Sequence, residues 1–373
     1  MIVEVIGLGR AGLPLACVMA DTGLDVIGVD VVPGLVETVN AGINPYPDEP
    51  GLDVSLIRAS AECVPADVFV IVVPVGLMPN NEPDLTYLEE ACRSVGEVLR
   101  EDNLVVVETT VPVGTTANEV RGWLEDTSGL KLGEFYLAHS PERIMSGMAV
   151  SRLNNFPKVV GGVTAACGIK AHHFYASFLS DVRMAADSKT AEFTKIAEGC
   201  YRDANIALAN ELYMAAQTYG INYTEAARLA NHEYCHLHRP SVGVGGHCIP
   251  VYPHFLISDS RIDRPLYIEC ARDLNDSMIH YWVQRLLFEM NYDSQVKLCL
   301  RGITYRPGVK SIVGSRAINL YRELQEFELD VGVFDENYTR DEIELLGFRY
   351  IEPSDANIVF DTHTLEITHD QTS

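Results

Sequence analysis

The chain has 373 residues, 47% of them hydrophobic, so it is long enough to bury more than one core, and we expect two or three domains. Its formal net charge of -24 argues against a nucleic-acid partner, because affinity for nucleic acid depends on clustered Lys and Arg. The first residues lack the basic start of a signal peptide, and no apolar run is long enough to span a bilayer. The nine cysteines are scattered without a C-x-x-C pair, which favours a reducing compartment. We therefore expect a cytoplasmic protein with no nucleic-acid or membrane partner.

The N-terminus has the order strand, glycine turn, helix, strand. A β-branched run over residues 2–6 leads into Gly7, Gly9 and Gly12, and the next apolar run ends at Asp30. In this context G-x-G-x-x-G predicts a dinucleotide site, although a glycine turn of an unrelated α/β protein is the alternative. Gly7 permits the tight turn, Gly9 lets the backbone approach a pyrophosphate, and Gly12 lets helix and strand pack closely. Asp30 would accept hydrogen bonds from ribose hydroxyls and repel a 2′-phosphate, so NAD is favoured over NADP.

Two further buried strands are predicted within residues 66–75 and 103–116. In parallel sheets, ligands bind outside the carboxyl ends of the strands. Thr109, Thr110 and the turn at residues 112–114 are therefore expected to form the floor of a site, and ordinary capping of a strand end is the alternative.

A long helix is predicted over residues 189–219, ended by Gly220. The residues expected to face the core at i, i+3, i+4 spacing are Phe193, Ile196, Ala197, Cys200, Ala204, Ala207 and Leu208. Lys195, Gly199 and Arg202 fall together on another face. That face either lines a pocket or, as is commoner for such charges, is solvated.

From about residue 296 the chain repeats the rhythm of strand, helix and strand, with a strand ending at Asp335 and a last strand in ANIVFDTH. We expect an α/β protein with two Rossmann-type units around a helical segment. The predicted domains are an NAD-binding Rossmann domain at 1–186, a central helical domain at 187–290, and a smaller Rossmann-like domain at 291–373.

The stretch GVGGHCIP, residues 243–250, places His247 and Cys248 directly after a run of glycines. Backbone amides exposed by glycines help to stabilise a thiolate. Beside NAD, such a cysteine suits oxidation of an aldehyde to an acid. Its attack gives a thiohemiacetal, hydride leaves to NAD, and a thioester remains for water.

A metal site is the alternative in the same region. His232, Glu233 and His236 match H-E-x-x-H, in which two histidines one helical turn apart bind zinc. Pro240 and the glycines end any helix at once, which weighs against this interpretation.

The chain resembles the UDP-glucose/GDP-mannose dehydrogenase superfamily over nearly its full length, most closely the UDP-N-acetylmannosamine (UDP-N-acetylhexosamine) dehydrogenase branch. The stretches that carry the resemblance are GLGRAGLPLA with Asp30, NAGINPYPDEPGL, NNEPDL, ETTVPVGTT, HSPERIMSG, PKVVGG, AEFTKIAEGCYRDANIALANEL and GVGGHCIP. HCIP after the glycines points to the N-acetylhexosamine branch. The resemblance implies an NAD-dependent, two-step oxidation of the C6 alcohol of a nucleotide sugar to a carboxylate, for polysaccharide biosynthesis. It also implies a homodimer built through the central helix, with dimerisation and active-site roles for the domain at 187–290. The shortened C-terminal domain at 291–373 is implied to bind the nucleotide sugar.

The resemblance assigns roles to particular residues. Cys248 carries the thiohemiacetal and thioester, and Lys195 stabilises the oxyanion. Thr110 and Glu142 place and activate the hydrolytic water. The implied cofactor-binding residues are Gly7, Gly9, Arg10, Ala11, Gly12, Asp30, Pro74, Val75, Thr109 and Thr110. The implied substrate-binding residues are Arg143, Lys195, Arg202, Gly245, His247, Tyr305 and Arg306. No metal is expected.

Several positions depart from the family pattern. Gly199 stands where the family has Asn, Tyr252 where it has Asp, and Val75 where it has Thr. The Pro-Arg pair before the glycine loop is absent from HEYCHLHRP, and the Asp-Asp-x-Arg-Glu-Ser pattern near the C-terminus appears as KSIVGS. A phenol does not replace a carboxylate base near neutral pH.

The leading hypothesis is an NAD-dependent nucleotide-sugar 6-dehydrogenase acting on a UDP-sugar, with a UDP-N-acetylhexosamine as the expected substrate. The first alternative is a diverged member of the family with another substrate, or a non-catalytic protein that binds NAD or a nucleotide. A metal site at HEYCH is the third interpretation.

Overall fold

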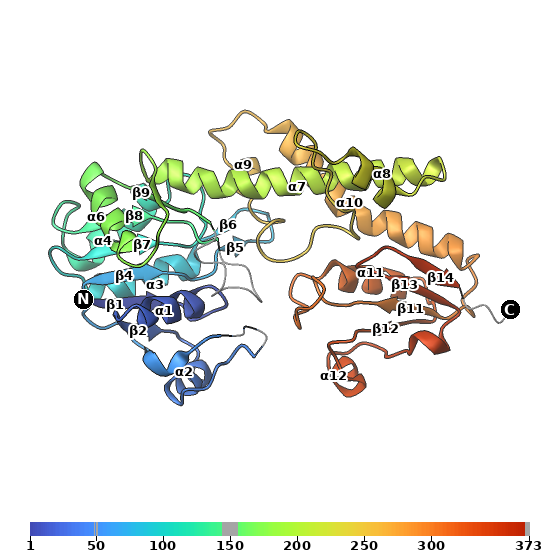
Figure 1. The fold of residues 1–373 in the computed structure, drawn as a ribbon, viewed down its shortest axis with the longest axis horizontal. Helices are drawn as coiled ribbons and strands as arrows, with labels where there is room; N and C mark the ends of the chain where they lie inside the picture. Colours follow the sequence, from blue (N-terminus) through green and yellow to red (C-terminus); the bar gives the residue numbers. More distant parts are fainter. Residues whose placement is uncertain (48, 50, 144–155, 370–373) are drawn as a thin grey trace. The chain divides into compact units, whose positions relative to one another are not determined.

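The computed structural model describes residues 1–47, 49, 51–143 and 156–369 (Figure 1). The chain divides into two compact units, residues 1–197 and residues 198–373, and the boundary lies inside the long helix α7 (Ser188–Thr218). Each unit contains a sheet of mainly parallel strands. The predicted α/β class, with a Rossmann-like sheet toward each end of the chain, is confirmed. The predicted three-domain boundaries stay a prediction.

The described strands of unit 1 form an eight-stranded sheet in the order β10-β9-β8-β7-β4-β1-β2-β3. Their bounds are β1 (Ile2–Ile6), β2 (Asp25–Val29), β3 (Arg58–Ser60), β4 (Val68–Ile71), β7 (Leu104–Val107), β8 (Tyr136–His139), β9 (Lys158–Gly162) and β10 (Val182–Met184). Paired strands run parallel except β8 and β9. Because β1 lies between β2 and β4, the loops after β1 and β4 are neighbours at one edge of the sheet.

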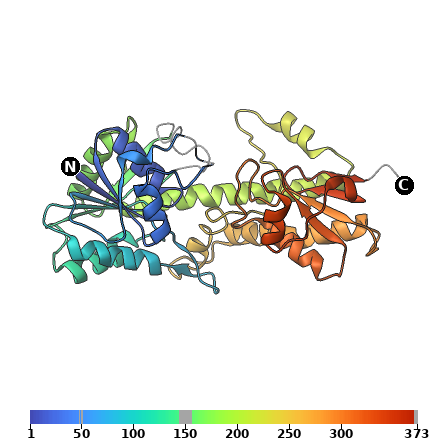
Figure 2. The same cartoon turned by 90° about the horizontal axis from the view of Figure 1, so that it is seen from below.

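Helices cover both faces of this sheet (Figure 2). Their bounds are α1 (Gly12–Asp21), α2 (Pro33–Asn40), α3 (Thr86–Val98), α4 (Arg121–Ser128) and α6 (Ala165–Ala176), and a short hairpin is formed by β5 (Gly76–Leu77) and β6 (Pro83–Asp84). Val3 and Val5 of β1 share one core cluster with apolar residues of α1 and α6. Alternate side chains of a strand point to opposite faces, so strands covered on both sides are apolar almost throughout.

Unit 2 contains a smaller sheet in the order β12-β11-β13-β14. Its elements are α8 (Tyr223–Ala230), α9 (His254–Ile257), α10 (Leu266–Glu289), β11 (Leu298–Arg301), α11 (Arg316–Gln325), β12 (Val331–Phe334), α12 (Arg340–Leu345), β13 (Ile358–Asp361) and β14 (Ile367–His369). Trp282 of α10 is buried and stacks on Phe360 of β13 at 4.6 Å between ring centroids. The predicted strands and helix are confirmed, and the antiparallel β14 and the helix α12 were not predicted.

The long helix α7 begins and ends within one residue of the prediction. Four members of the predicted core-facing set are buried, namely Ile196, Cys200, Ala204 and Ala207. Phe193 and Leu208 are 50% and 41% exposed, so the prediction is wrong for these two. The small side chains Ala204 and Ala207 pack with Ala271 of α10, and Leu208 lies on a neighbouring face with the exposed Leu212.

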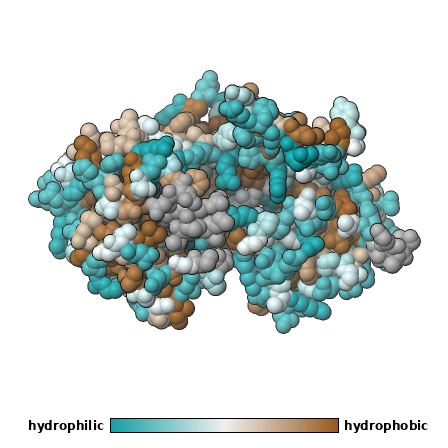
Figure 3. Space-filling view, in the orientation of Figure 1, coloured by the Kyte–Doolittle hydropathy of each residue, from teal (hydrophilic) through white to brown (hydrophobic). Residues whose placement is uncertain are grey.

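The surface fits the acidic composition. Hydrophilic residues cover much of the face of the molecule that Figure 3 shows. Within the described ranges, no helix combines the length and the apolar composition that crossing a bilayer requires.

The buried carboxyl of Glu4 in β1 makes the stability of the fold depend on pH. Its side chain is fully buried and accepts a hydrogen bond of 2.8 Å from the Val64 N–H. Burial raises the pKa of this carboxyl to about 7, and hydrogen bonds from Val64 and Cys63 oppose that rise. The pKa is higher in the folded chain than in the unfolded one, so the group contributes stability below pH 4.5 that is lost as the pH rises to about 7.

We expect Glu4→Gln to match the wild type near pH 4.5 and to exceed its free energy of unfolding by up to about 3 kcal/mol near pH 8. Urea denaturation of both proteins across this pH range measures the difference. An equal difference at all pH values would contradict the assignment of a raised pKa to Glu4.

Candidate active site

The glycines after β1 are required by close backbone contacts. Gly7 has a φ of +95°, and its N–H donates to the Val29 carbonyl at 2.7 Å. A Cβ at Gly7 would lie 2.7 Å from the Val72 carbonyl oxygen, and one at Gly12 only 1.8 Å from the Gly7 carbonyl oxygen. Only glycine fits these two positions, which holds the loop after β1 against the loop after β4 and the start of α1.

Gly9 differs from its neighbours, because a Cβ there would meet no protein atom within 4 Å. Helix α1 begins behind it with Ala11 as N-cap residue, which supplies no side-chain hydrogen bond, and its first turn has no acidic side chain. A helix N-terminus of this kind attracts an anionic group. The space over Gly9 therefore suits a pyrophosphate.

Asp30, at the end of β2, is held in place by two backbone donors. Its carboxylate accepts hydrogen bonds from the Leu8 N–H at 2.8 Å and the Val32 N–H at 2.9 Å. A carboxylate has about four acceptor positions, so two remain for ribose hydroxyls. The Tyr46 hydroxyl donates to the Leu8 carbonyl at 3.0 Å, and the Arg10 guanidinium lies 5.1 Å from the Tyr46 ring centroid. The residues present therefore fit NAD.

The remaining predicted cofactor residues follow β4 and β7. Pro74 is exposed and Val75 is buried in the loop after β4. Thr109 follows β7, and its hydroxyl donates to the Val73 carbonyl at 2.6 Å. The structure therefore brings the cofactor residues predicted from the sequence to the carboxyl ends of β1, β2, β4 and β7.

Thr110 lies in the same unit, beside a turn that is fixed by helix α7. The Glu192 carboxylate accepts hydrogen bonds from the N–H groups of Gly114 and Thr116 at 2.6 and 2.8 Å. Lys195 follows Glu192 by three residues on α7, which places the two on neighbouring positions of one helix face. The Thr110 hydroxyl is buried and forms no hydrogen bond with any residue that the structure describes.

A buried ion pair joins Lys158 to Glu108, which lies two residues before Thr110. Lys158 Nζ is 2.7 Å from Glu108 Oε2, and the Tyr175 hydroxyl donates to the same carboxylate. The Glu108 carbonyl accepts a hydrogen bond of 3.2 Å from the Glu142 N–H. Burial lowers the pKa of Lys158; Glu108 and Glu142 raise it, and Lys195 lowers it further. The structure thus groups the predicted Glu142 and Lys195 around one buried cation.

Sequence reasoning missed Glu108, Lys158 and Glu192. All three lie inside stretches that carry the family resemblance, ETTVPVGTT, PKVVGG and AEFTKIAEG, but their type and spacing do not reveal the pairing. His139 is a further buried group nearby. Burial, and then the charge of Lys158, lowers its pKa to about 3, so the imidazole is neutral.

Arg143 donates to the Pro157 carbonyl at 2.6 Å in unit 1. The part of the HSPERIMSG stretch that begins at residue 144 lies outside the described residues.

Cys248 lies in unit 2 at the start of a helical turn. Its carbonyl accepts hydrogen bonds from the N–H groups of Val251 and Tyr252 at 3.0 and 3.1 Å, and α9 follows directly. The Cys248 side chain is half-buried, whereas His247 is exposed.

The glycines before Cys248 pack against another backbone segment of the same unit. The Gly246 N–H donates to the Gly314 carbonyl at 2.9 Å. A Cβ at Gly245 would lie 2.6 Å from that carbonyl oxygen, and a Cβ at Gly314 would lie 2.8 Å from the Gly246 carbonyl oxygen. These glycines therefore allow two backbone segments to touch.

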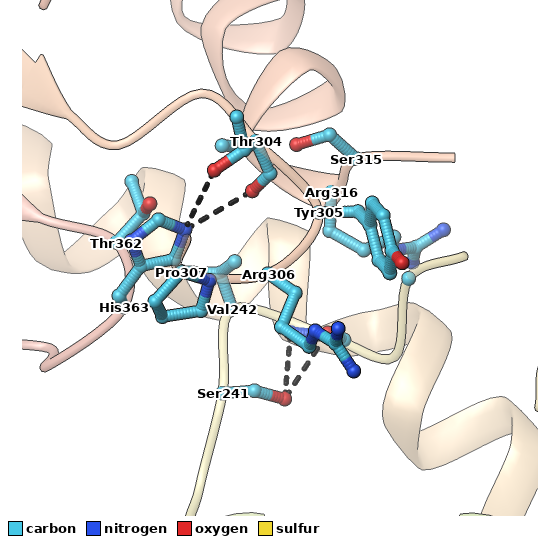
Figure 4. A pocket seen from close by; sticks show the side chains of 13 residues that line it. Ser241, Val242, Thr304, Tyr305, Arg306, Pro307, Ser315, Arg316, Thr362 and His363 are labelled. Atoms are coloured by element: carbon cyan, nitrogen blue, oxygen red, sulfur yellow. Dashed lines mark hydrogen bonds between the residues drawn. The ribbon is translucent and has the colours of Figure 1, made fainter. Parts of the chain in front are cut away.

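Gly245 of this contact lines a pocket with a volume of about 150 Å³ (Figure 4). Its lining residues are Ser241, Val242, Gly243, Gly245, Thr304, Tyr305, Arg306, Pro307, Ser315, Arg316, Ala317, Thr362 and His363. In Figure 4, the His363 ring lies within hydrogen-bond distance of the Thr304 carbonyl. Tyr305 and Arg306 lie on the side of the pocket away from His363. Three residues of the predicted substrate set, Gly245, Tyr305 and Arg306, thus line one pocket.

Two basic groups and several hydroxyls line this pocket. Arg316 pairs with Asp276 at 3.1 Å; burial lowers its pKa and Asp276 raises it. The Ser315 hydroxyl is buried and forms no hydrogen bond within the described residues. The pocket therefore offers positive charge and an unused donor to an anion.

Four residues of the predicted substrate set do not line this pocket. Arg143 and Lys195 lie in unit 1, and His247 and Arg202 are exposed. Burial, and then the charge of Arg202, lowers the pKa of His238.

The H-E-x-x-H segment is not helical. Helix α8 ends at Ala230, and His232 and Cys235 exchange backbone hydrogen bonds of 2.9 and 3.1 Å around a turn. The zinc motif needs a helix to align its two histidines. Across the described part of the chain, no three or more His, Cys, Asp or Glu residues are grouped to hold a metal.

Residues 1–179 match the NAD binding domain of the UDP-glucose/GDP-mannose dehydrogenase family, and residues 189–277 match its central domain. A UDP-N-acetyl-D-mannosamine dehydrogenase of Pyrococcus horikoshii is 34% identical over 97% of this chain and 90% of that protein. An NDP-N-acetyl-D-galactosaminuronic acid dehydrogenase of Ralstonia solanacearum is 35% identical over 88% of this chain and 81% of that protein. The solved structure of the P. horikoshii UDP-D-ManNAc dehydrogenase superposes with a TM-score of 0.89 at 31% identity, covering 97% of this chain and 89% of that one.

The Rossmann sheet with its glycine turn and Asp30 defines an NAD-dependent oxidoreductase. The chain belongs to the UDP-glucose/GDP-mannose dehydrogenase family, whose members are NAD-dependent nucleotide-sugar dehydrogenases.

Gly9 and Gly12 provide a matched test of the cofactor site. A Cβ at Gly9 meets only open space, so we expect Gly9→Ala to unfold at the wild-type temperature but to bind NAD about tenfold or more weakly, because the methyl group takes the space of the pyrophosphate. Gly12→Ala places a Cβ only 1.8 Å from the Gly7 carbonyl oxygen, so it should lower both thermal stability and affinity for NAD. Calorimetric titration with NAD and thermal melts measure the two effects. Wild-type affinity in Gly9→Ala would contradict the placement of the pyrophosphate.

Proposed function

We propose that the chain oxidises the C6 alcohol of a UDP-N-acetylhexosamine to the uronate, with UDP-N-acetylmannosamine as the first candidate. The observation that carries this proposal is the pocket of unit 2, where Gly245, Tyr305 and Arg306 meet beside Arg316. Two guanidinium groups and a row of hydroxyls suit a phosphate group. The P. horikoshii relative carries the name of the mannosamine enzyme.

The volume of the pocket is large enough for only part of a nucleotide sugar. At about 150 Å³, it is smaller than pockets that enclose a drug-sized ligand, which are about 300–1,000 Å³. We therefore propose that this pocket holds the phosphate groups and that the rest of the substrate extends beyond it.

In this proposal Cys248 is the nucleophile. Its sulfur adds to the C6 aldehyde, holds the sugar as a thiohemiacetal and then as a thioester, and is released when water attacks. NAD, when bound, supplies the hydride acceptor for both oxidations. Lys195 stabilises the oxyanion. It lies three residues after the buried Glu192 on α7, and its charge is close enough to Lys158 to lower the pKa of that group.

Thr110 and Glu142 handle the hydrolytic water. The unused, buried hydroxyl of Thr110 supports this role, because a buried polar atom without a protein partner suits a water molecule or a substrate oxygen. Tyr252 supplies no carboxylate beside Cys248, so activation of the water depends on Glu142 alone. We expect hydrolysis of the thioester to be the slow step.

The substrate test is oxidation of a panel of nucleotide sugars. UDP-N-acetylmannosamine, UDP-N-acetylgalactosamine, UDP-N-acetylglucosamine and UDP-glucose are each incubated with protein and NAD, and reduced cofactor is followed by absorbance. The galactosaminuronic acid relative is as similar as the mannosamine one, so both acetylated sugars belong in the panel. We expect two reduced cofactors per sugar on one N-acetylhexosamine. Binding of NAD without reduction on any sugar would contradict the proposal and favour a binding protein.

Cys248→Ser tests the nucleophile with the same assay. We expect acid formation to fall by at least about 1,000-fold, because the covalent intermediate cannot form, whereas NAD affinity stays within about twofold. Retention of acid formation would remove Cys248 from the mechanism.

We also propose that the chain forms a homodimer through α7. Apolar side chains that recur on one face of this helix are exposed, namely Tyr201 (58%), Leu208 (41%) and Leu212 (37%). Intervals of 7 and 4 residues keep these side chains on one face, and such a stripe is typical of a helix interface.

We expect the pair Leu208→Glu and Leu212→Glu to convert a dimer into a monomer in size-exclusion chromatography with light scattering. Leu345→Glu is the control, because Leu345 of α12 is 88% exposed and lies outside the stripe. A wild-type monomer, or a dimer unaffected by the double substitution, would contradict an interface on α7.

We propose a cytoplasmic location and a place in polysaccharide biosynthesis. The scattered cysteines, without a C-x-x-C pair, support the first. The second rests on the proposed uronate product.

A further inference from the structure

Tyr252 packs directly against Gly199 of α7 within unit 2. A Cβ placed at Gly199 would lie 2.6 Å from Tyr252 Cδ2, 2.9 Å from its Cβ and 3.2 Å from its Cγ. Both residues are buried, with Tyr252 only 7% exposed. The tyrosine side chain therefore occupies the space that any side chain at position 199 would need.

The backbone of Tyr252 belongs to the turn that begins at Cys248. The Tyr252 N–H donates to the Cys248 carbonyl at 3.1 Å, the hydrogen bond of a helical turn. Residues four apart in such a turn lie on the same face. Tyr252 thus links Cys248 to α7, and α9 continues from the same turn with Phe255 N–H donating to the Tyr252 carbonyl at 3.1 Å.

We propose that Tyr252 is a positioning residue for Cys248, and that Gly199 is required to admit it. The contact with Tyr252 Cβ is the decisive detail. Rotation of the ring would relieve a clash with Cδ2, but the Cβ position is fixed by the backbone. A side chain at position 199 therefore displaces the turn itself and the cysteine with it. The inference rests on the proposed role of Cys248.

Alkylation of Cys248 by iodoacetamide tests the positioning without any sugar. The modified peptides are quantified by mass spectrometry over a range of pH, with the exposed Cys270 of α10 as a reference in the same chain. We expect Tyr252→Ala and Gly199→Ala to shift the pH profile of Cys248 alkylation, since a displaced turn changes the surroundings of the sulfur. The alkylation of Cys270 should not change.

The same variants are then assayed as dehydrogenases. We expect kcat to fall on the order of 100-fold in each, because a displacement of about 1 Å costs that much, while the KM for NAD stays unchanged. Tyr252→Phe keeps the ring and should restore both kcat and the alkylation profile. A loss in Tyr252→Phe as large as in Tyr252→Ala would overturn the role of the ring.

Two controls separate positioning from a general loss of stability. Gly122→Ala adds a methyl group to α4, where a Cβ meets nothing within 4 Å. Tyr321→Ala removes another buried tyrosine of unit 2, which is 8% exposed. Both should leave the alkylation profile of Cys248 unchanged. A shift in either one equal to that of Gly199→Ala would overturn the proposal.

Gly199→Ala combined with Tyr252→Gly, with Tyr252→Gly alone as the second single variant, completes a double-mutant cycle. Glycine at position 252 removes both the ring and the Cβ, so the overlap with position 199 disappears and the second substitution should add less than about twofold to the effect on kcat. Additive losses would show that the two sites act separately. If no sugar is oxidised at all, the proposed function fails, and the alkylation data still decide the positioning of Cys248.

Discussion

Contact between two glycine-containing backbone segments organises unit 2. Gly245 and Gly246 meet Gly314 with no room for a Cβ at positions 245 and 314. On one side of this contact, Tyr305 and Arg306 line the pocket that we assign to the phosphate groups. On the other side, the chain enters the helical turn of Cys248. The glycines therefore serve the packing of the protein and set the start of the nucleophile's turn. Any side chain in the contact would disturb the pocket and the cysteine together.

In unit 1, buried charged side chains hold the segments that carry Thr110 and Glu142. Thr110 and Glu142 lie in the segments that directly follow β7 and β8. The buried Glu108–Lys158 pair lies beneath both, and the Glu192 carboxylate binds two amides of the turn after Thr110. Removing one partner of a buried pair leaves an uncompensated charge, so such pairs favour a single arrangement of the segments that they join. The turn after Thr110 is thereby fixed to α7, and the Glu142 N–H is fixed to the Glu108 carbonyl.

The sequence predicted the parts of the fold whose cause is local. The glycine turn and Asp30 were predicted because strand, turn and helix follow one another directly, and the structure places them as expected. Leu208 was assigned to the core because spacing alone does not reveal that Ala204 and Ala207 pack closely against α10 and leave their neighbour exposed. H-E-x-x-H was a candidate metal motif only while the segment could be helical. Gly199 and Tyr252 looked like two separate losses, because their contact joins positions 53 residues apart.

The central claim is that Cys248 carries the sugar covalently during oxidation. The most direct measurement is mass spectrometry of the Cys248 peptide from an acid-quenched reaction with NAD and the preferred nucleotide sugar. Because no carboxylate stands at position 252, hydrolysis should be slow and the thioester should accumulate on this peptide during turnover. Steady formation of the acid with the Cys248 peptide unmodified throughout, or with the sugar attached to another residue, would contradict the account.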